Sequence, residues 1–218
     1  MGRTEAEVST DLARRIVAGG HTRVNFAIVA AGANSASPHH EPSDRVVGPG
    51  EPVLCDFGGT MHDEWGVGYC SDITRCVWTG DVPADAAEIY DVLELAQRAG
   101  VDAGIVGSSC ESVDRACREV LDAHGLGEYF IHRTGHGIGV EEHEDPYIVD
   151  GNTQVLEAGH CYSVEPGVYL PGRFGFRLED IVVATPDGPV ALNTADRRLA
   201  GLRDRVGGAG RSREPGPC

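Results

Sequence analysis

Two glutamates interrupt apolar, strand-like runs in the second half of this chain. Glu165 lies within residues 163–167, SVEPG, and Glu179 lies within residues 176–180, FRLED. A carboxylate in an apolar setting is costly unless something compensates its charge. A divalent metal ion is the simplest compensation for both, together with a histidine from the glycine-rich turn at residues 132–144. This pattern favours a fold that surrounds a metal site.

Two aspartates in the first half extend the pattern. Asp56 and Asp72 also lie in strand-like apolar sequence, where each could simply cap a turn. That interpretation weakens once they are joined by His136, Glu165 and Glu179. Four carboxylates cancel the charge of two divalent cations, so the set predicts a two-metal centre with a bridging water or hydroxide. Oxygen-rich ligation favours manganese before zinc, with cobalt or iron as alternatives.

Composition limits the class of protein. The 218 residues suffice for one domain with a sizeable core. A formal net charge of −16 disfavours nucleic acid and anionic membranes as partners. No apolar run approaches a membrane span, and no signal-peptide pattern opens the chain. Seven cysteines without a CxxC pair favour free thiols in a reducing compartment, so a cytoplasmic location is expected.

Periodicity and turn residues predict alternating helices and strands. Thr4 and Glu7 form a capping-box pattern at the start of the first helix. Residues 1–200 are expected to form the domain, and residues 201–218, rich in Gly, Arg and Pro, a disordered tail. The expected elements are helices at 4–18, 83–99 and 112–123, strands at 26–30, 53–57, 67–78, 161–170 and 176–184, and a loop at 59–66.

Six short motifs follow one another in the chain: Pro38-His39, Asp56-x-Gly58, Ser71-Asp72-Ile73-Thr74-Arg75, Gly135-His136-Gly137-Ile138-Gly139, Val164-Glu165-Pro166-Gly167 and Arg177-Leu178-Glu179-Asp180. In this order they resemble the M24 metallopeptidases, the pita-bread enzymes that include aminopeptidase P, prolidase and methionine aminopeptidase. The resemblance covers roughly residues 4–184, and its Arg-x-Glu-Asp ending is similar to the aminopeptidase P and prolidase branch. It implies an α+β fold in which helices back a curved, mostly antiparallel sheet, in two pseudo-symmetric halves.

The resemblance, carried over residue by residue, assigns the metal ligands. Asp56 would chelate one ion. His136 and Glu165 would bind the other. Asp72 and Glu179 would bridge the two.

The resemblance also assigns residues that act on the substrate. His143 would hydrogen-bond the scissile peptide and support the tetrahedral intermediate. His39 and His132 would line the substrate cleft, and Glu165 would be the proton shuttle. The alternative for the three histidines is a solvated loop position or a helix-terminal hydrogen bond.

Three further side chains receive an interpretation. Arg177 would orient Asp72 or Glu179 from behind the metal ligands. His40 is expected to be a solvated loop histidine or to make a helix-terminal hydrogen bond, because Pro38-His39 already matches the family motif. Tyr169 is expected to be an ordinary core or rim aromatic.

The chain departs from the family pattern in two places. The link between Asp56 and Asp72 is longer than usual, and the extra residues fall in the expected loop at 59–66, where loops absorb insertions at low cost. The Gly-x-Thr-Glu sequence at Gly2 resembles the start of the family's second helix. The preceding helix and the N-terminal domain of aminopeptidase P and prolidase have no counterpart in this sequence.

The resemblance implies a function. The expected activity is metal-dependent hydrolysis of the peptide bond in Xaa-Pro peptides or dipeptides, by an aminopeptidase or a dipeptidase. Short proline-containing peptides are the expected partners, and a homodimer is compatible with the family. The alternatives are a non-peptidase pita-bread hydrolase or lyase, and a catalytically impaired peptide-binding pseudoenzyme.

Overall fold

The computed structural model describes residues 2–202 of the chain. All but two residues of the expected disordered tail therefore lie outside the described residues. The elements in chain order are α1 (Glu5–Ala18), β1 (Arg23–Ala31), the 3-10 helix η1 (Gly32–Ala36), β2 (Pro52–His62), β3 (Gly68–Trp78), α2 (Ala84–Ala103), α3 (Cys110–Ala123), the 3-10 helix η2 (Gly127–Tyr129), β4 (Gly135–Gly137), β5 (Glu144–Ile148), β6 (Cys161–Val164), β7 (Gly167–Leu170), β8 (Phe174–Arg177), β9 (Asp180–Thr185), β10 (Gly188–Ala191) and β11 (Ala200–Gly201).

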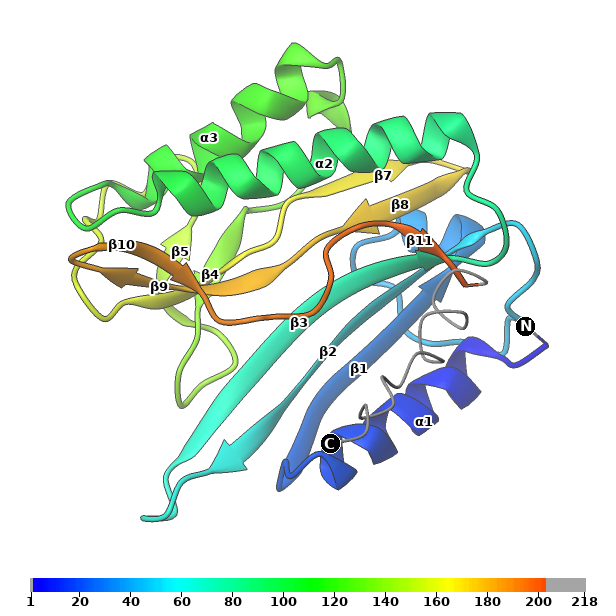
Figure 1. Cartoon of the computed structure of the whole chain (residues 1–218), viewed down its shortest axis with the longest axis horizontal. Helices are drawn as coiled ribbons and strands as arrows, with labels where there is room; N and C mark the ends of the chain where they lie inside the picture. The colour runs from blue at the N-terminus through cyan, green and yellow to red at the C-terminus, as the bar shows by residue number, and fades with distance from the viewer. Residues whose placement is uncertain (1, 203–218) are drawn as a thin grey trace, which may run out of the picture.

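The strands form three sheets that lie between helices. One sheet has the order β1-β2-β3-β11, a second has the order β10-β9-β6-β4-β5, and β7 pairs with β8 alone. Every pairing is antiparallel except that of β11 with β3. Helix α1 lies on one side of the molecule, and α2 and α3 lie together on the other (Figure 1). The predicted α+β fold with mostly antiparallel sheets is confirmed.

The helices begin and end close to their expected positions. Thr4 caps α1, its side chain accepts from the Glu7 amide, and the Glu7 side chain accepts from the Thr4 amide, so the predicted capping box is present. Pro83 is the N-cap of α2 and lies outside its first turn, and α2 continues to Ala103 before Gly104. In the described part of the chain no helix has the length and apolar character needed to cross a membrane.

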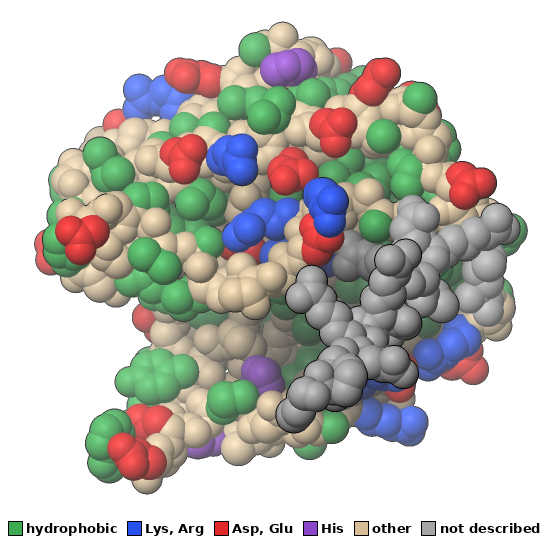
Figure 2. Space-filling model, in the orientation of Figure 1, with side chains coloured by type: hydrophobic (Ala, Val, Ile, Leu, Met, Phe, Trp, Pro, Cys, Tyr) green, Lys and Arg blue, Asp and Glu red, His purple; other side chains and the backbone are tan. Residues whose placement is uncertain are grey.

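The β2–β3 hairpin is longer than predicted. The expected loop at 59–66 is wrong in its first half, because Gly59 continues β2 and pairs with Ser71 of β3. A side chain at Gly59 would lie 2.5 Å from the carbonyl oxygen of Arg23, so β1 approaches too closely for any larger residue. The end of the hairpin projects from the molecular surface, and its Trp65 is 80% exposed (Figure 2).

The two strands predicted around the glutamates are each divided in two. The chain leaves β6 at Glu165-Pro166 and re-enters a different sheet as β7, and it makes a second change of sheet between β8 and β9, at Glu179. Pro166 has no amide hydrogen to continue a ladder. The Glu179 amide instead donates to the carbonyl of Thr74 on β3, at 3.4 Å. Both glutamates therefore lie at junctions between sheets.

Two apolar clusters hold these layers together. The larger cluster packs α2 and α3 against the inner faces of the strands and includes Trp78, Tyr90 and Phe176. Tyr90 and Phe176 meet edge to face with ring centroids 5.2 Å apart. The smaller cluster, which includes Val29 and Val53, packs against α1. Strand β11 adds to the edge beside Trp78 and extends one residue past the domain boundary expected at residue 200.

A buried carboxylate fixes α1 to the loop that follows η1. Glu5 is fully buried, and its Oε1 accepts from the Ala31 amide at 2.7 Å and from Asn34 Nδ2 at 3.0 Å. Its Oε2 accepts from Ser43 Oγ at 2.6 Å and lies 2.8 Å from His40 Nε2. Burial alone raises the pKa of Glu5, but these hydrogen bonds outweigh it and lower the pKa. His40 therefore contacts a side chain at the first residue of α1, which fits the expected hydrogen bond at a helix terminus and not the solvated alternative.

Replacing Glu5 leaves several buried donors without a partner, and each such group costs about 1–3 kcal/mol. We expect Glu5→Ala to lower the free energy of unfolding by about 3 kcal/mol or more in urea denaturation. Because folding lowers the pKa of Glu5, its stabilisation is present above about pH 4.3 and is lost as the pH falls through the folded-state value. The matched variant Glu7→Ala, which removes an exposed cap contact, should cost about 1 kcal/mol. If the two substitutions lowered the free energy of unfolding equally, the role assigned to Glu5 would be wrong.

Candidate metal centre

The structure brings all eight predicted site residues into the wall of one cavity of about 620 Å³. The cavity lies where the three sheets meet, and its apolar walls come from β1 and from the segment at and after β5. The predicted site residues that line it are His39, Asp56, Asp72, His132, His136, His143, Glu165 and Glu179.

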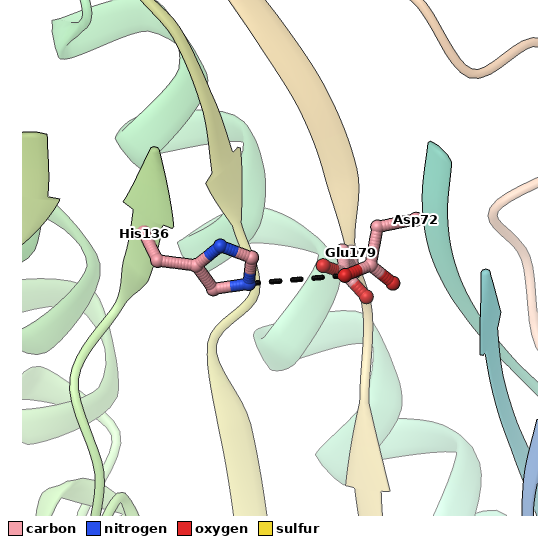
Figure 3. A group of neighbouring side chains, drawn as sticks. All are labelled: Asp72, His136 and Glu179. Carbon is pink, nitrogen blue, oxygen red and sulfur yellow. Dashed lines mark ion pairs between the residues drawn. The ribbon is translucent and has the colours of Figure 1, made fainter. Parts of the chain in front are cut away.

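Three of these side chains form a tight group. Asp72, His136 and Glu179 are buried and each offers one ligand atom, all within 4.8 Å of one another. Figure 3 shows the imidazole of β4 facing the carboxylate of β3, with His136 Nε2 3.8 Å from Asp72 Oδ2. The same nitrogen lies 3.4 Å from Glu165 Oε1. His136 Nδ1 donates to the carbonyl of Gly137 at 3.0 Å, so in the neutral ring the Nε2 lone pair points to the carboxylates.

Hydroxyl groups orient these side chains from behind. Ser163 Oγ accepts from the His136 amide at 2.9 Å and donates to Glu165 Oε1 at 3.1 Å. Thr74 Oγ1 donates to Glu179 Oε2 at 2.6 Å. The β2–β3 register places Asp56 opposite Thr74, so Asp56, Thr74 and Asp72 project from the same face of the hairpin.

The carboxylates are crowded and incompletely paired. Burial raises the pKa of Asp72 well above its ordinary value, and repulsion from Glu179 adds to the effect. Burial and repulsion from Glu165 do the same to Glu179, and burial raises the pKa of Glu165 to about 7. Asp56 Oδ1 and Asp72 Oδ1 are buried and have no hydrogen-bond partner. Oxygen atoms left unpaired beside a free imidazole nitrogen fit divalent metal ions.

Arg177 holds a different carboxylate from the ones predicted. Its Nη2 donates to Asp56 Oδ2 at 2.5 Å, and its Nε lies 3.8 Å from Glu165 Oε2. Of the two carboxylates that it was expected to orient, Arg177 reaches Glu179 indirectly, because its Nε donates to Thr74 Oγ1 at 3.3 Å and that hydroxyl donates to Glu179. Arg177 is the last residue of β8, and β8 packs against β2, which carries Asp56.

Tyr169 is buried, as expected of a core aromatic, but its hydroxyl group joins two side chains of the cavity wall. Its hydroxyl oxygen accepts from Arg177 Nη1 at 2.9 Å and its proton is donated to His132 Nε2 at 2.8 Å. His132 Nδ1 donates to the carbonyl of Arg133 at 2.6 Å. Burial lowers the pKa of His132 to about 3 and raises that of Tyr169 to about 12, so this chain of donors stays in one protonation state. The sequence contained one sign of this position. Tyr169 stands between the core residues Val168 and Leu170, and neighbouring side chains of a strand point to opposite faces.

The other two histidines lie at the mouth of the cavity. The ring of His143 stacks at a tilt on that of His136, with centroids 4.1 Å apart, and the side chain remains exposed. His39 is also exposed and lines the cavity from the loop that contacts Glu5. Burial lowers the pKa of His143, and the nearby charge of Arg133 lowers it further.

A metal ion that binds only the folded protein should stabilise it. At a free concentration 100 times the dissociation constant the gain is about 2.7 kcal/mol, or roughly 5–10 °C for a chain of this length. We expect Mn²⁺ to raise the melting temperature by this amount and a chelator to reverse it. Asp72→Asn should lose most of the shift, whereas Asp91→Asn, on the exposed face of α2, should keep it. An unchanged melting curve with metal would refute the site.

Comparisons with known proteins point to the same family as the sequence motifs. The model of metallopeptidase family M24 matches residues 1–186. The "Probable dipeptidase PepE" of Mycobacterium bovis is 50% identical over 198 residues, which are 91% of this chain and 52% of that protein. The Xaa-Pro dipeptidase of Lactobacillus delbrueckii subsp. lactis is 49% identical over 161 residues, 74% of this chain and 42% of that protein. The chain thus spans about half the length of the curated relatives it matches.

A solved structure gives the same result for the fold. The X-Pro aminopeptidase from Thermotoga maritima matches with a TM-score of 0.88 and 37% identity, over 92% of this chain and 56% of that chain. The predicted pita-bread fold is confirmed, as is the resemblance to the aminopeptidase P and prolidase branch. The chain belongs to metallopeptidase family M24.

Proposed function

We propose that this chain hydrolyses the peptide bond before proline in short peptides, with two divalent metal ions held by its acidic cavity. One observation carries the proposal. Two buried carboxylate oxygens, on Asp56 and Asp72, have no hydrogen-bond partner, and both residues line the same cavity as a histidine whose Nε2 is free to bind a metal. With Glu165 and Glu179 they supply the four negative charges that two such ions neutralise. Oxygen-rich ligation makes manganese the first candidate, before cobalt, zinc or iron.

The names of the relatives support the substrate class. The curated relatives described above are named as a dipeptidase and an Xaa-Pro dipeptidase, and the solved structure as an X-Pro aminopeptidase. These names share an exopeptidase activity on short peptides. Two of the three names also specify proline as the residue after the cleaved bond.

The side chains around the cavity have distinct tasks in this reaction. Bound divalent ions supply a Lewis acid for the scissile carbonyl and lower the pKa of the attacking water. Glu165 takes up the proton from that water and returns it to the leaving nitrogen. His143, beside His136 at the mouth, donates a hydrogen bond to the carbonyl oxygen as negative charge develops on it. His39 and His132 line the remaining walls and hold the peptide in place.

Four further predictions accompany this function. The six cysteines of the described residues are free thiols, which fits the reducing cytoplasm. A homodimer stays a prediction, as does the domain boundary at residue 200. The net charge of −16 is the reason to expect neither nucleic acid nor anionic membrane among the partners.

The role of His143 can be tested by its removal. A hydrogen bond that strengthens in the transition state affects kcat more than substrate binding. We expect His143→Ala to lower kcat on an Xaa-Pro dipeptide by about 10²–10³-fold, with both metal ions retained by elemental analysis. His124→Ala, at the exposed C-terminal end of α3, is the matched control and should keep the parental rate. A parental rate in His143→Ala would refute the assigned role.

The role of Glu165 has a separate test. Glu165→Gln keeps the size of the side chain but removes its ability to carry a proton. We expect it to abolish turnover and to disturb binding of one metal ion, measured by elemental analysis and single-turnover kinetics. If the parental protein, with both ions verified, leaves Xaa-Pro peptides intact but acts on another C–N bond, the peptidase proposal fails while the fold assignment holds. If it binds such peptides and transforms none of them, the chain is a binding protein.

A further inference from the structure

The junction between β3 and β9 decides how far apart the two predicted bridging carboxylates lie. Asp72 is on β3, and β9 begins directly after Glu179. The two carboxylates lie next to each other, with ligand atoms within 4.8 Å (Figure 3). The strands belong to different sheets, and the backbone hydrogen bond from the Glu179 amide to the Thr74 carbonyl is long, at 3.4 Å. Side chains must therefore hold this junction.

The side chain of Asn193 joins the backbones of both strands. Its Oδ1 accepts from the Ile181 amide of β9 at 2.6 Å, and its Nδ2 donates to the Asp72 carbonyl of β3 at 3.0 Å. One planar amide group thus fixes the main chain of one predicted bridging ligand against the strand that begins after the other. Both distances are those of ordinary, well-formed hydrogen bonds.

Two strand ends make these backbone groups available to Asn193. Strand β10 pairs with β9 up to Ala191, and the Leu192 amide still donates to the Ile181 carbonyl at 2.8 Å. Beyond that point the side chain of Asn193 replaces the backbone carbonyl that would continue the ladder. Strand β11 pairs with β3 only at the last two residues of β3, so among the described residues no strand pairs with Asp72 on that side. Its carbonyl needs a donor from elsewhere.

Arg75 holds the same junction at Glu179 itself. Its Nη1 donates to the Glu179 carbonyl at 2.5 Å, and its Nη2 donates to Asp180 Oδ1 at 2.7 Å. It also donates to two carbonyls in the segment that carries Asn193. Loss of Arg75 would take a cationic partner from the buried Asp180, which endangers the whole fold. Asn193 is uncharged and half-buried, so it is the member of this junction that can be replaced.

We propose that Asn193 is a positioning residue that sets the separation of the two bridging carboxylates and thereby the affinity for the second metal ion. The inference rests on the two-metal centre of the proposed function. Asn193 follows all six sequence motifs and lies beyond residues 1–186, which the family model matches. It is not among the residues that line the metal cavity, so it acts through the backbone that carries the ligands. Groups that orient metal ligands in this way change metal affinity by about 10–100-fold when they are removed.

Metal binding tests this inference without turnover. Mn²⁺ is titrated by calorimetry into the metal-free full chain, and electron paramagnetic resonance spectra are recorded on the same samples. Two Mn²⁺ ions about 3.5–4 Å apart couple magnetically, so their spectrum differs from that of isolated ions. In Asn193→Ala the second ion should bind roughly 10- to 100-fold more weakly, and the spectrum of isolated ions should replace that of the pair. Asn193→Gln should restore part of the affinity, because it keeps the amide group on a longer stem.

Asn152→Ala is the matched control. Asn152 is also half-buried, and its amide group joins the Tyr147 carbonyl to the Gln154 amide in the turn that follows β5. Neither partner adjoins a predicted metal ligand, so this variant should keep the parental Mn²⁺ affinity and the spectrum of the pair. Melting curves of the metal-free proteins measure the purely structural effect. If Asn193 served the fold alone, its loss would lower the metal-free melting temperature and leave the metal affinity unchanged.

Each outcome decides the inference. Parental affinity and a coupled spectrum in folded Asn193→Ala refute it and leave the peptidase function standing. If Asn193→Ala does not fold, the same two parental values in Asn193→Gln refute it. A parental protein that binds both ions and cleaves no Xaa-Pro peptide refutes the peptidase function, and a weakened second ion in Asn193→Ala then still supports the inference. A parental protein that binds fewer than two ions refutes both.

Discussion

Repulsion among buried carboxylates is the constraint around which this structure is arranged. Asp72 and Glu179 are almost inaccessible to water, and burial raises the pKa of each, with repulsion from Glu179 adding to it at Asp72 and repulsion from Glu165 at Glu179. Water cannot screen these charges, so the protein surrounds them with donors and leaves specific oxygens free. Arg177 neutralises Asp56 from one side, and Thr74 donates to Glu179 from another. The remaining negative charge faces the cavity, where divalent cations would bind.

The same constraint explains why the site lies at the meeting point of three sheets. A regular strand pairs its amides with neighbouring strands and offers its side chains to one of two faces. At Glu165 and Glu179 the chain instead changes sheets, and each glutamate reaches side chains from another layer. The contact of Thr74 with both the backbone and the side chain of Glu179 joins the β2–β3 hairpin to β9. The ligand geometry and the connection between the sheets are therefore one structural feature.

Much of the fold and of the candidate site could be predicted because its signals are local. The capping box of α1, the turn glycines and the alternation of apolar residues depend on neighbours in the chain. The cost of a carboxylate in an apolar run is also visible locally, and it indicated Asp56, Asp72 and Glu179 before any contact was known. The strand breaks were missed because Val164 and Val168 on either side of Pro166 are equally apolar. Apolarity shows that a segment is buried and says nothing about which sheet buries it.

By itself, the sequence determined which residue types carry the chemistry and in what order they occur, since the cost of burying charge is a property of the residue and its immediate surroundings. The tertiary structure decided how those residues pair. Arg177 is bonded to Asp56 and Tyr169, partners 121 and eight positions away, because β8 lies against β2 and pairs with β7. The buried Nε of Arg133, which has no hydrogen-bond partner, is likewise a result of the tertiary structure. Whether a long cationic side chain finds a hydrogen-bond partner depends on every element packed around it, and no local sequence pattern encodes those contacts.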